Sequence, residues 1–186
     1  DARDLRRGAG RRRDEAAELW KKALSLTDRM TEREKYRTFG GYYLAMTQNY
    51  DKAIESFSTL VRLYPYDSVG HVNLALAYFY NRQFDKALEE GRRSIEVDPK
   101  SLINHNNYAL YAMYSSDFET AATEARNNIK QDPTYFRSYL PSAVAAIVNG
   151  DFPTALDAYT KMGEGDVQAA VVASIGLADL AVYQGR

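Results

Sequence analysis

The stretch HVNLALAYFYNRQFDKALEEGRRSIEVDP, residues 71–99, decides the fold of this chain. Small and apolar residues fill its first part, a short polar turn follows, and a second amphipathic part ends at Asp98-Pro99. Apolar residues at spacings of three and four predict a helix in each part. Proline has no N–H and its ring clashes with the preceding turn, so Pro99 should end the second helix. The stretch therefore predicts two antiparallel helices joined by a tight turn.

The same pattern recurs along the chain with a constant spacing of 34 residues. The pattern consists of an aromatic residue, an alanine three residues later and, in three cases, a proline twelve residues after the alanine. The aromatics are Tyr50, Phe84, Phe118 and Phe152, the alanines are Ala53, Ala87, Ala121 and Ala155, and the prolines are Pro65, Pro99 and Pro133. Self-similarity of this length is typical of two-helix repeats that stack into a solenoid. We expect the alanines where two helices cross too closely for a larger side chain, and the aromatics at the base of each second helix.

The spacing predicts an all-α fold, a right-handed superhelical solenoid of antiparallel helix hairpins that forms one domain. The expected limits are a degenerate repeat at 1–33, four repeats at 34–67, 68–101, 102–135 and 136–169, and the first helix of a truncated repeat at 170–186. In the degenerate repeat, residues 1–9 would end a first helix and residues 14–28 would form a second helix. In this alignment, the small, aromatic and small residues of the other second helices correspond to Ala16, Trp20 and Ala23.

Three features interrupt the expected helices. Gly40 and Gly41 lie inside the first helix of the first repeat, where each costs roughly 1 kcal/mol relative to alanine, so we expect a close helix–helix approach there. Pro141 falls near the start of a first helix and removes a backbone hydrogen bond unless it lies in the first turn. The segment Gly163–Asp166 replaces the usual proline, and we expect a flexible junction between repeats.

Composition excludes several classes of protein. The formal net charge is −1 at neutral pH, so no overall field draws the chain to nucleic acid or to a membrane surface. The chain has no cysteine, which excludes disulfides, thiol catalysis and cysteine-ligated metals but leaves the compartment open. No apolar stretch reaches the roughly 20 residues that span a bilayer. The N-terminus is polar and lacks an initiator methionine, so we expect a fragment of a longer protein.

These residues resemble the tetratricopeptide repeat family, whose pattern runs from Leu or Gly with a small neighbour through Tyr, Ala, an aromatic and Ala to Pro. The second repeat matches at Leu74, Ala75, Tyr78, Ala87 and Pro99, with Gly91 and Ser94 replacing the aromatic and the last alanine. The first repeat matches at Gly41, Ala53, Phe57 and Pro65, with Leu60 replacing alanine. The resemblance covers nearly the whole chain and implies a protein-interaction scaffold whose first helices line a concave groove.

A weaker resemblance concerns the stretches TEREKYRTFGGYY, NLALAY and EEGRRSIEVDP. They look like the repeat regions of bacterial multi-domain regulators, which include eukaryotic-like serine/threonine protein kinases. This resemblance implies a regulatory parent protein, although the chain itself contains no kinase motif.

No constellation of residues predicts catalysis. His71 and His105 occupy equivalent positions in neighbouring repeats, on the order of 10 Å apart, so they cannot share one metal, and we expect half-buried rings near the helix starts. The segment Gly163–Asp166 lacks the strand and the lysine of a phosphate loop. The arginines at the start (Arg3, Arg6, Arg7, Arg11, Arg12 and Arg13) are expected on a solvated helix face. We therefore predict no enzyme activity in this chain, no cofactor and no metal.

The groove that the resemblance implies is the candidate site. The matching positions are Tyr42, Met46, Val72, Asn73, Leu76, Phe79, Tyr80, Asn106, Asn107, Leu110, Met113 and Tyr114, and Leu140, Ile147 and Val148 continue them. Their apolar side chains offer contact area, and Asn73 and Asn107 can each hydrogen-bond a peptide backbone. They suit an extended or helical peptide with apolar side chains. The alternative is that some of these residues pack between helices or are covered by another part of a longer protein.

One specialised groove can be tested by residue type. Some members of the family clamp the C-terminal carboxylate of heat-shock chaperones with lysine, asparagine and arginine. The matching positions here hold Thr38, Tyr42, Asn73, Ile103 and Asn107, without any basic residue. We predict that this clamp is absent.

Three functions follow as hypotheses. The first is a scaffold that binds a peptide or helix of a partner protein, as a regulatory fragment of a larger bacterial protein. The second is self-association, for example as a homodimer, through the groove or through the apolar stretch AAVVASIGLADLAV. The third is a non-catalytic sensor region of a serine/threonine kinase. A cytoplasmic location and an extracytoplasmic domain of a membrane-anchored regulator both fit, and no nucleic acid or membrane contact is expected.

Overall fold

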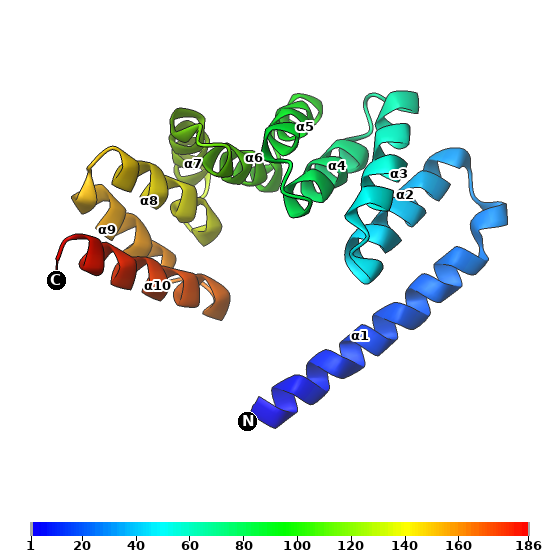
Figure 1. The fold of residues 1–186 in the computed structure, drawn as a ribbon, viewed down its shortest axis with the longest axis horizontal. Coiled ribbons are helices and arrows are strands. Elements are labelled where there is room, and N and C mark those ends of the chain that lie inside the picture. The colour runs from blue at the N-terminus through cyan, green and yellow to red at the C-terminus, as the bar shows by residue number, and fades with distance from the viewer. Residues whose placement is uncertain (1, 186) are drawn as a thin grey trace. The chain divides into compact units, whose positions relative to one another are not determined.

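The structure is a computed structural model that describes residues 2–185, with the side chains of residues 14–185. Every regular element in this range is helical, and no strand occurs within it (Figure 1). The helices fall into two compact units, Asp1–Arg82 and Gln83–Arg186, which we describe one at a time. The prediction of an all-α fold built from helix pairs is confirmed.

The first unit holds four α-helices. They are α1 (Ala2–Ser25), α2 (Glu32–Tyr42), α3 (Tyr50–Leu63) and α4 (Ser68–Tyr80). A 3₁₀ turn, η1 (Thr27–Arg29), follows α1, and a π-helical turn, η2 (Tyr43–Thr47), extends α2. Helix α2 packs on α3, and α3 packs on α4.

The second unit holds six α-helices, each of which packs on the next. They are α5 (Phe84–Val97), α6 (Leu102–Tyr114), α7 (Phe118–Gln131), α8 (Tyr139–Val148), α9 (Phe152–Met162) and α10 (Val167–Tyr183). A 3₁₀ turn, η3 (Phe136–Ser138), precedes α8. We call α2, α4, α6, α8 and α10 the first helices and α3, α5, α7 and α9 the second helices; the repeat limits and the single solenoid domain stay predictions.

The recurring alanines lie at the helix crossings. Ala53, Ala87, Ala121 and Ala155 are each 0% exposed, and all four sit in the first turns of second helices. A methyl group is the largest side chain that such close backbone approach admits, because interiors are packed without room for extra atoms. The expected role of these alanines is confirmed.

Three of the four recurring aromatics join a second helix to the first helix that follows it. The Tyr50 ring at the start of α3 stacks on Tyr80 at the end of α4, with 5.5 Å between ring centroids. Phe84 and Tyr114 repeat this contact between α5 and α6 at 5.4 Å, and Phe152 and Tyr183 repeat it between α9 and α10 at 5.7 Å. The 34-residue spacing thus reproduces one inter-helix contact along the chain.

The terminating prolines carry a second recurring contact. The carbonyl oxygens of Pro65, Pro99 and Pro133 each lie within hydrogen-bond distance of the side chain six residues later: His71 Nε2 at 2.8 Å, His105 Nε2 at 3.0 Å and Tyr139 Oη at 3.1 Å. An imidazole that carries a proton on Nε2 and a tyrosine hydroxyl can both donate to a carbonyl. The two histidines therefore hold the junctions between repeats, which agrees with the structural role expected for them.

Gly40 and Gly41 mark close approaches to α2. A Cβ at Gly40 would lie 2.7 Å from the ring of Phe57 on α3, and one at Gly41 would lie 2.8 Å from the ring of Trp20 on α1. Real Cβ atoms do not come so close, so both rings occupy the space of a missing side chain. The expected close helix approach is confirmed.

Helix α1 corrects one prediction. The degenerate repeat was expected to end one helix over residues 1–9 and to form another over residues 14–28, but the structure has one continuous helix, Ala2–Ser25 (Figure 1). Three of the four later second helices are capped by side-chain oxygens, those of Asn49, Asp117 and Asp151, whereas Gln83 at the start of α5 makes no such bond. The equivalent residue, Arg12, has no oxygen to accept that bond, and arginine favours helix.

The remaining interruptions are accommodated. Pro141 is the third residue of α8, in the first turn, where its missing N–H removes no helical hydrogen bond. Gly163–Asp166 joins α9 to α10, and Asp166 Oδ1 accepts a hydrogen bond from the Ala169 N–H at 2.8 Å. This segment is a junction, as expected. The arginines between Arg3 and Arg13 lie outside the side chains that the structure describes.

Candidate functional site

One side of each of the first helices α4 and α6 carries exposed apolar residues at equivalent positions. On α4 these positions hold Val69, Asn73, Leu76 and Tyr80, and on α6 they hold Ile103, Asn107, Leu110 and Tyr114. Spacings of four, three and four residues place each set on one side of a helix. The outer members, Val69, Tyr80, Ile103 and Tyr114, are 44–58% exposed, and the inner members are half-buried. We call these two sets the α4 stripe and the α6 stripe.

The first helices that carry the stripes lack charge. The sequences of α4 (SVGHVNLALAYFY), α6 (LINHNNYALYAMY) and α8 (YLPSAVAAIV) contain no Asp, Glu, Lys or Arg. The second helices α5 and α7 are charged, and Glu89, Arg92, Arg93 and Glu96 form ion pairs along α5. An ordinary solvated helix face carries charged residues, so an exposed face without them favours contact with another apolar surface.

The predicted groove residues divide between these two stripes and the interior of each unit. Leu76, Tyr80, Leu110, Tyr114 and the two asparagines Asn73 and Asn107 belong to the stripes, whereas Val72, Phe79 and Met113 are half-buried beside them. Leu140 and Ile147 are half-buried on α8, and Val148 is exposed. In the first repeat, Met46 is half-buried within η2, and the Tyr42 ring packs on Trp20 of α1 at 6.1 Å. Whether any of these residues binds a partner stays a proposal.

Asn106 does not lie on this surface. Its side chain is buried at 7% exposure, and its Oδ1 accepts a hydrogen bond from Ser138 Oγ at 3.3 Å. The Asn128 amide of α7 donates to the same hydroxyl at 3.2 Å. Asn106 therefore joins α6 to α7 and α8 through a buried polar network, which its one-residue offset from Asn107 could not reveal in the sequence.

The two stripe asparagines are not equivalent. The Asn73 amide donates to the Val69 carbonyl oxygen of its own helix at 2.8 Å, which uses one of its two protons. The Asn107 amide has no hydrogen-bond partner among the described residues. Of the two, Asn107 is the better placed to pair with a peptide backbone.

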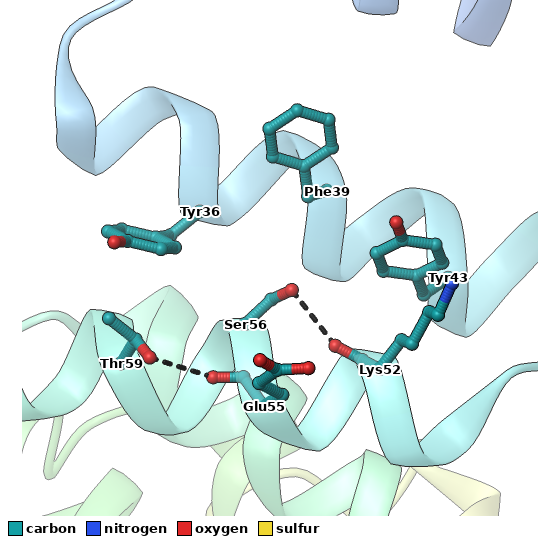
Figure 2. Close-up of a pocket in the computed structure, with 7 residues that line it drawn as sticks. All are labelled: Tyr36, Phe39, Tyr43, Lys52, Glu55, Ser56 and Thr59. Carbon is teal, nitrogen blue, oxygen red and sulfur yellow. Dashed lines mark hydrogen bonds between the residues drawn. The ribbon is translucent and has the colours of Figure 1, made fainter.

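The first unit also has a pocket between α2 and α3 (Figure 2). It has a volume of about 350 Å³. Its lining is Tyr36 and Phe39 from α2, Tyr43 from η2, and Lys52, Glu55, Ser56 and Thr59 from α3. Figure 2 shows Tyr36 near Thr59 at one end and Tyr43 near Lys52 at the other. Aromatic walls with a few polar groups are typical of sites that bind a partner's side chain.

The polar groups of this pocket are mostly hydrogen-bond acceptors. Ser56 Oγ donates its proton to the Lys52 carbonyl oxygen at 2.9 Å, and Thr59 Oγ1 donates to the Glu55 carbonyl oxygen at 3.0 Å (Figure 2). The Lys52 ammonium lies 5.4 Å from the centroid of the Tyr43 ring. Within the described residues, the Glu55 carboxylate has neither a hydrogen-bond nor an ion-pair partner.

Sequence reasoning missed this pocket and two exposed members of the stripes, Val69 and Ile103. The 34-residue spacing carried the signal, since Tyr36 stands where the other repeats have Gly70, Asn104 and Ser138. A large aromatic residue at a position that is small elsewhere indicates a different surface. The four-residue spacing from Val69 to Asn73 and from Ile103 to Asn107 could likewise have identified Val69 and Ile103 as the first members of the stripes.

Metal binding and membrane insertion can be examined over the described residues. No group of three or more His, Asp or Glu side chains in that range could hold a metal ion. His105 Nδ1 instead lies 2.6 Å from Glu124 Oε2 within the second unit. None of the described helices combines the length and apolarity needed to cross a membrane.

No protein-family model and no curated protein matches the sequence. Several solved structures do match the fold. TTC0263, a thermophilic TPR protein in Thermus thermophilus, is 21% identical with a TM-score of 0.71, and the match covers 93% of this chain and 94% of that one. YrrB, described as a TPR protein with an unusual peptide-binding site, is 17% identical with a TM-score of 0.68 and coverage of 90% and 86%. The TPR2B domain of yeast Sti1, solved as a complex with pHsp70, is 17% identical with a TM-score of 0.57 and coverage of 63% and 98%.

At these identities the likeness shows the fold. The chain has the helical-repeat fold of tetratricopeptide-repeat proteins, as the sequence pattern predicted. None of the three structures is described as part of a protein kinase, so the expected link to a kinase has no support.

Proposed function

We propose that this chain, which has the tetratricopeptide-repeat fold, is a protein-interaction scaffold that binds an uncharged, apolar segment of a partner protein on its first helices. The observation that carries this proposal is the pair of exposed stripes on helices without charged residues. YrrB is described as having a peptide-binding site, and the Sti1 domain was solved with a bound partner, which supports a binding role for the same fold. A regulatory role in a larger bacterial protein stays a prediction.

The residue types favour one class of partner segment. Val69, Leu76 and Tyr80 on α4 and their equivalents on α6 offer apolar contact, and Asn107 offers an amide that can pair with a backbone peptide group. The basic residues that would hold a terminal carboxylate are missing from these helices. Binding should therefore depend little on salt, because screening weakens only interactions between charges.

The test uses peptides selected on the whole chain from a random peptide library, with affinity measured by fluorescence polarisation. Val69→Glu and Ile103→Glu place a charge on the α4 and α6 stripes. Each is the second residue of its helix, where a carboxylate is favourable and the fold should persist. Burying that charge under an apolar peptide is costly, so we expect the affinity of the selected peptides to fall about tenfold or more.

The matched control is Leu156→Glu, at an exposed apolar residue of the second helix α9. It should leave peptide affinity unchanged. Equal losses in all three variants, or selected peptides that are acidic and bind only at low salt, would contradict the proposal.

A second candidate function is self-association through α10. Val167, Val171, Ile175, Val182 and Tyr183 are all more than half exposed on this helix, and Asp179 is its only charged residue. A second copy of the chain could cover these side chains and remove them from water.

A further inference from the structure

The pocket between α2 and α3 is lined by Tyr36, whose equivalents in the other repeats are smaller residues that contact the preceding second helix. In the second repeat, a Cβ at Gly70 would lie 2.9 Å from Val61 of the preceding second helix. In the third repeat, Asn104 donates to the Ser94 carbonyl oxygen of the preceding second helix at 3.4 Å.

In the fourth repeat, Ser138 accepts a hydrogen bond from Asn128 of the preceding second helix α7. Tyr36 is the equivalent residue of the first repeat, and the pocket that it lines lies toward the following second helix, with a lining from α2, η2 and α3. No described residue outside these three elements lines the pocket, so a side chain of a partner can enter it.

The chemistry of the Tyr36 end selects the group that can fill it. The hydroxyl protons of Ser56 and Thr59 are already donated to backbone carbonyls, so these oxygens can only accept hydrogen bonds. The Glu55 carboxylate accepts as well and has no partner among the described residues. The side chains of Tyr36 and Phe39 add aromatic surface. An occupant must bring hydrogen-bond donors and positive charge, and an anion is excluded by the carboxylate.

We propose that this end of the pocket binds an arginine side chain of a partner protein. A guanidinium is flat, permanently charged and carries five N–H donors, so it can stack on an aromatic ring while it donates to several acceptors at once. A lysine ammonium has three donors around a point and stacks less well. The chain's own nearby arginines on α2, Arg33 and Arg37, are held by Asp67 and are not competitors. The pocket shares no residue with the α4 and α6 stripes, so this proposal does not depend on peptide binding by the stripes.

Two charges of α3 should act on this site in opposite directions. Glu55 attracts the incoming cation, and Lys52, three residues earlier on the same helix, repels it. Removing the carboxylate should weaken arginine binding, whereas removing the ammonium should strengthen it. A site that only buried apolar surface would not show these opposite changes in arginine affinity when the two charges are removed.

The experiment titrates the whole chain with N-acetyl-arginine methylamide and follows the NMR signals of Tyr36 and Thr59. The corresponding lysine and leucine derivatives are the comparison probes. We expect saturable shifts with a dissociation constant in the millimolar range for arginine, and weaker binding of lysine. The leucine probe should produce no saturable shift.

The variants Glu55→Gln and Lys52→Gln separate the roles of the two charges. Arginine affinity should fall about tenfold in the first variant and rise severalfold in the second. Glu119→Gln, which changes an exposed glutamate of α7, is the matched control and should have no effect.

Tyr36→Leu keeps the pocket apolar and should remove the preference for arginine over lysine. Helicity measured by circular dichroism checks that each variant is folded. Equal binding of the three probes, or no saturable shift at Tyr36 and Thr59, would overturn the proposal. A Lys52→Gln variant that weakens binding would overturn it too. Loss of selected-peptide binding in the stripe variants, by contrast, would leave these arginine titrations unchanged.

Discussion

At the scale of single residues, the packing of α2 on α3 depends on the missing side chain at Gly40. Phe57 is 1% exposed, and its ring fills the space beside the Gly40 backbone. Glycine inside a helix costs about 1 kcal/mol relative to alanine, so its presence here is explained only by the contact that it permits. Local helix propensity and tertiary packing therefore oppose each other at this residue, and packing wins.

Gly40→Ala should destabilise the chain even though alanine is the better helix former. The new Cβ would lie 2.7 Å from the Phe57 ring, which is enclosed and cannot move away freely. Overpacking of this kind costs about 1–3 kcal/mol and outweighs a gain of about 1 kcal/mol in helix propensity. Urea unfolding followed by circular dichroism measures the difference. Phe57→Leu makes room beside Gly40, so adding Gly40→Ala to that variant should cost less; an equal cost would contradict the packing argument.

Single residues also show what the sequence could and could not predict. The alanines of the 34-residue pattern were predictable because any larger side chain is excluded wherever the same crossing recurs. Asn106 was not, since a helix position one residue from an exposed asparagine can face either the solvent or the next helix. The pairing of Asn106 with Ser138 depends on how α8 meets α6, which no local pattern encodes.

At the scale of elements, Asp67 fastens α2 to the start of α4. Its Oδ1 accepts the Gly70 N–H at 2.8 Å and so caps α4, while its Oδ2 lies 2.6 Å from Arg33 Nε and 2.8 Å from an Arg37 terminal nitrogen. Burial by itself raises the pKa of this carboxyl. The hydrogen bonds from Arg37, Arg33 and the Gly70 N–H outweigh burial and hold the pKa of Asp67 below its ordinary value.

These interactions of Asp67 predict how the stability of the chain depends on pH. Because the pKa is lower in the folded state, Asp67 contributes stability that is fully present above its unfolded pKa of about 3.9 and is lost as pH falls through its folded pKa. Asp67→Asn removes the charge and should lower the free energy of unfolding by about 1–3 kcal/mol at neutral pH. The gap between wild type and variant should shrink below about pH 4, as measured by urea unfolding across pH. A gap that stays constant with pH would contradict this role.

The elements themselves were largely predictable, and the exception is instructive. Helix ends followed from the prolines and from the polar capping residues, such as Asn49 and Asp117, that begin second helices. At the start of the chain the sequence overlay predicted a turn because alanine and tryptophan fit the register. The overlay gave no weight to the missing cap at Arg12, and the helix runs through as α1.

At the scale of the whole molecule, helix α10 leaves several large apolar side chains in water. Helix α10 packs through small and apolar residues, Ala169, Ala173, Gly176 and Leu180. Its remaining sides expose valine, isoleucine and tyrosine with a single aspartate. The sequence predicted this apolar helix from its composition, but which residues stay exposed depends on its contact with α9.

If α10 mediates self-association, the mass of the chain should rise with concentration. Light scattering coupled to size exclusion should show a dimer for wild type at high concentration and a monomer for Ile175→Glu, because the charge would have to be buried in the interface. Leu156→Glu, on the exposed face of α9, is the control and should behave as wild type. A wild-type chain that stays monomeric at every concentration would rule out this interface.

The bond between each terminating proline and a side chain six residues later has a consequence for how such a chain can change in length. If residues 68–101 were excised, Leu102 would follow Asp67 and His105 would stand six residues after Pro65, where His71 stands now. Excision of residues 102–135 would place Tyr139 six residues after Pro99 in the same manner. Histidine and tyrosine both reach the proline carbonyl, so each repeat carries the side chain that bonds to the repeat before it. Whole repeats can therefore be lost or duplicated without a new contact between repeats having to evolve.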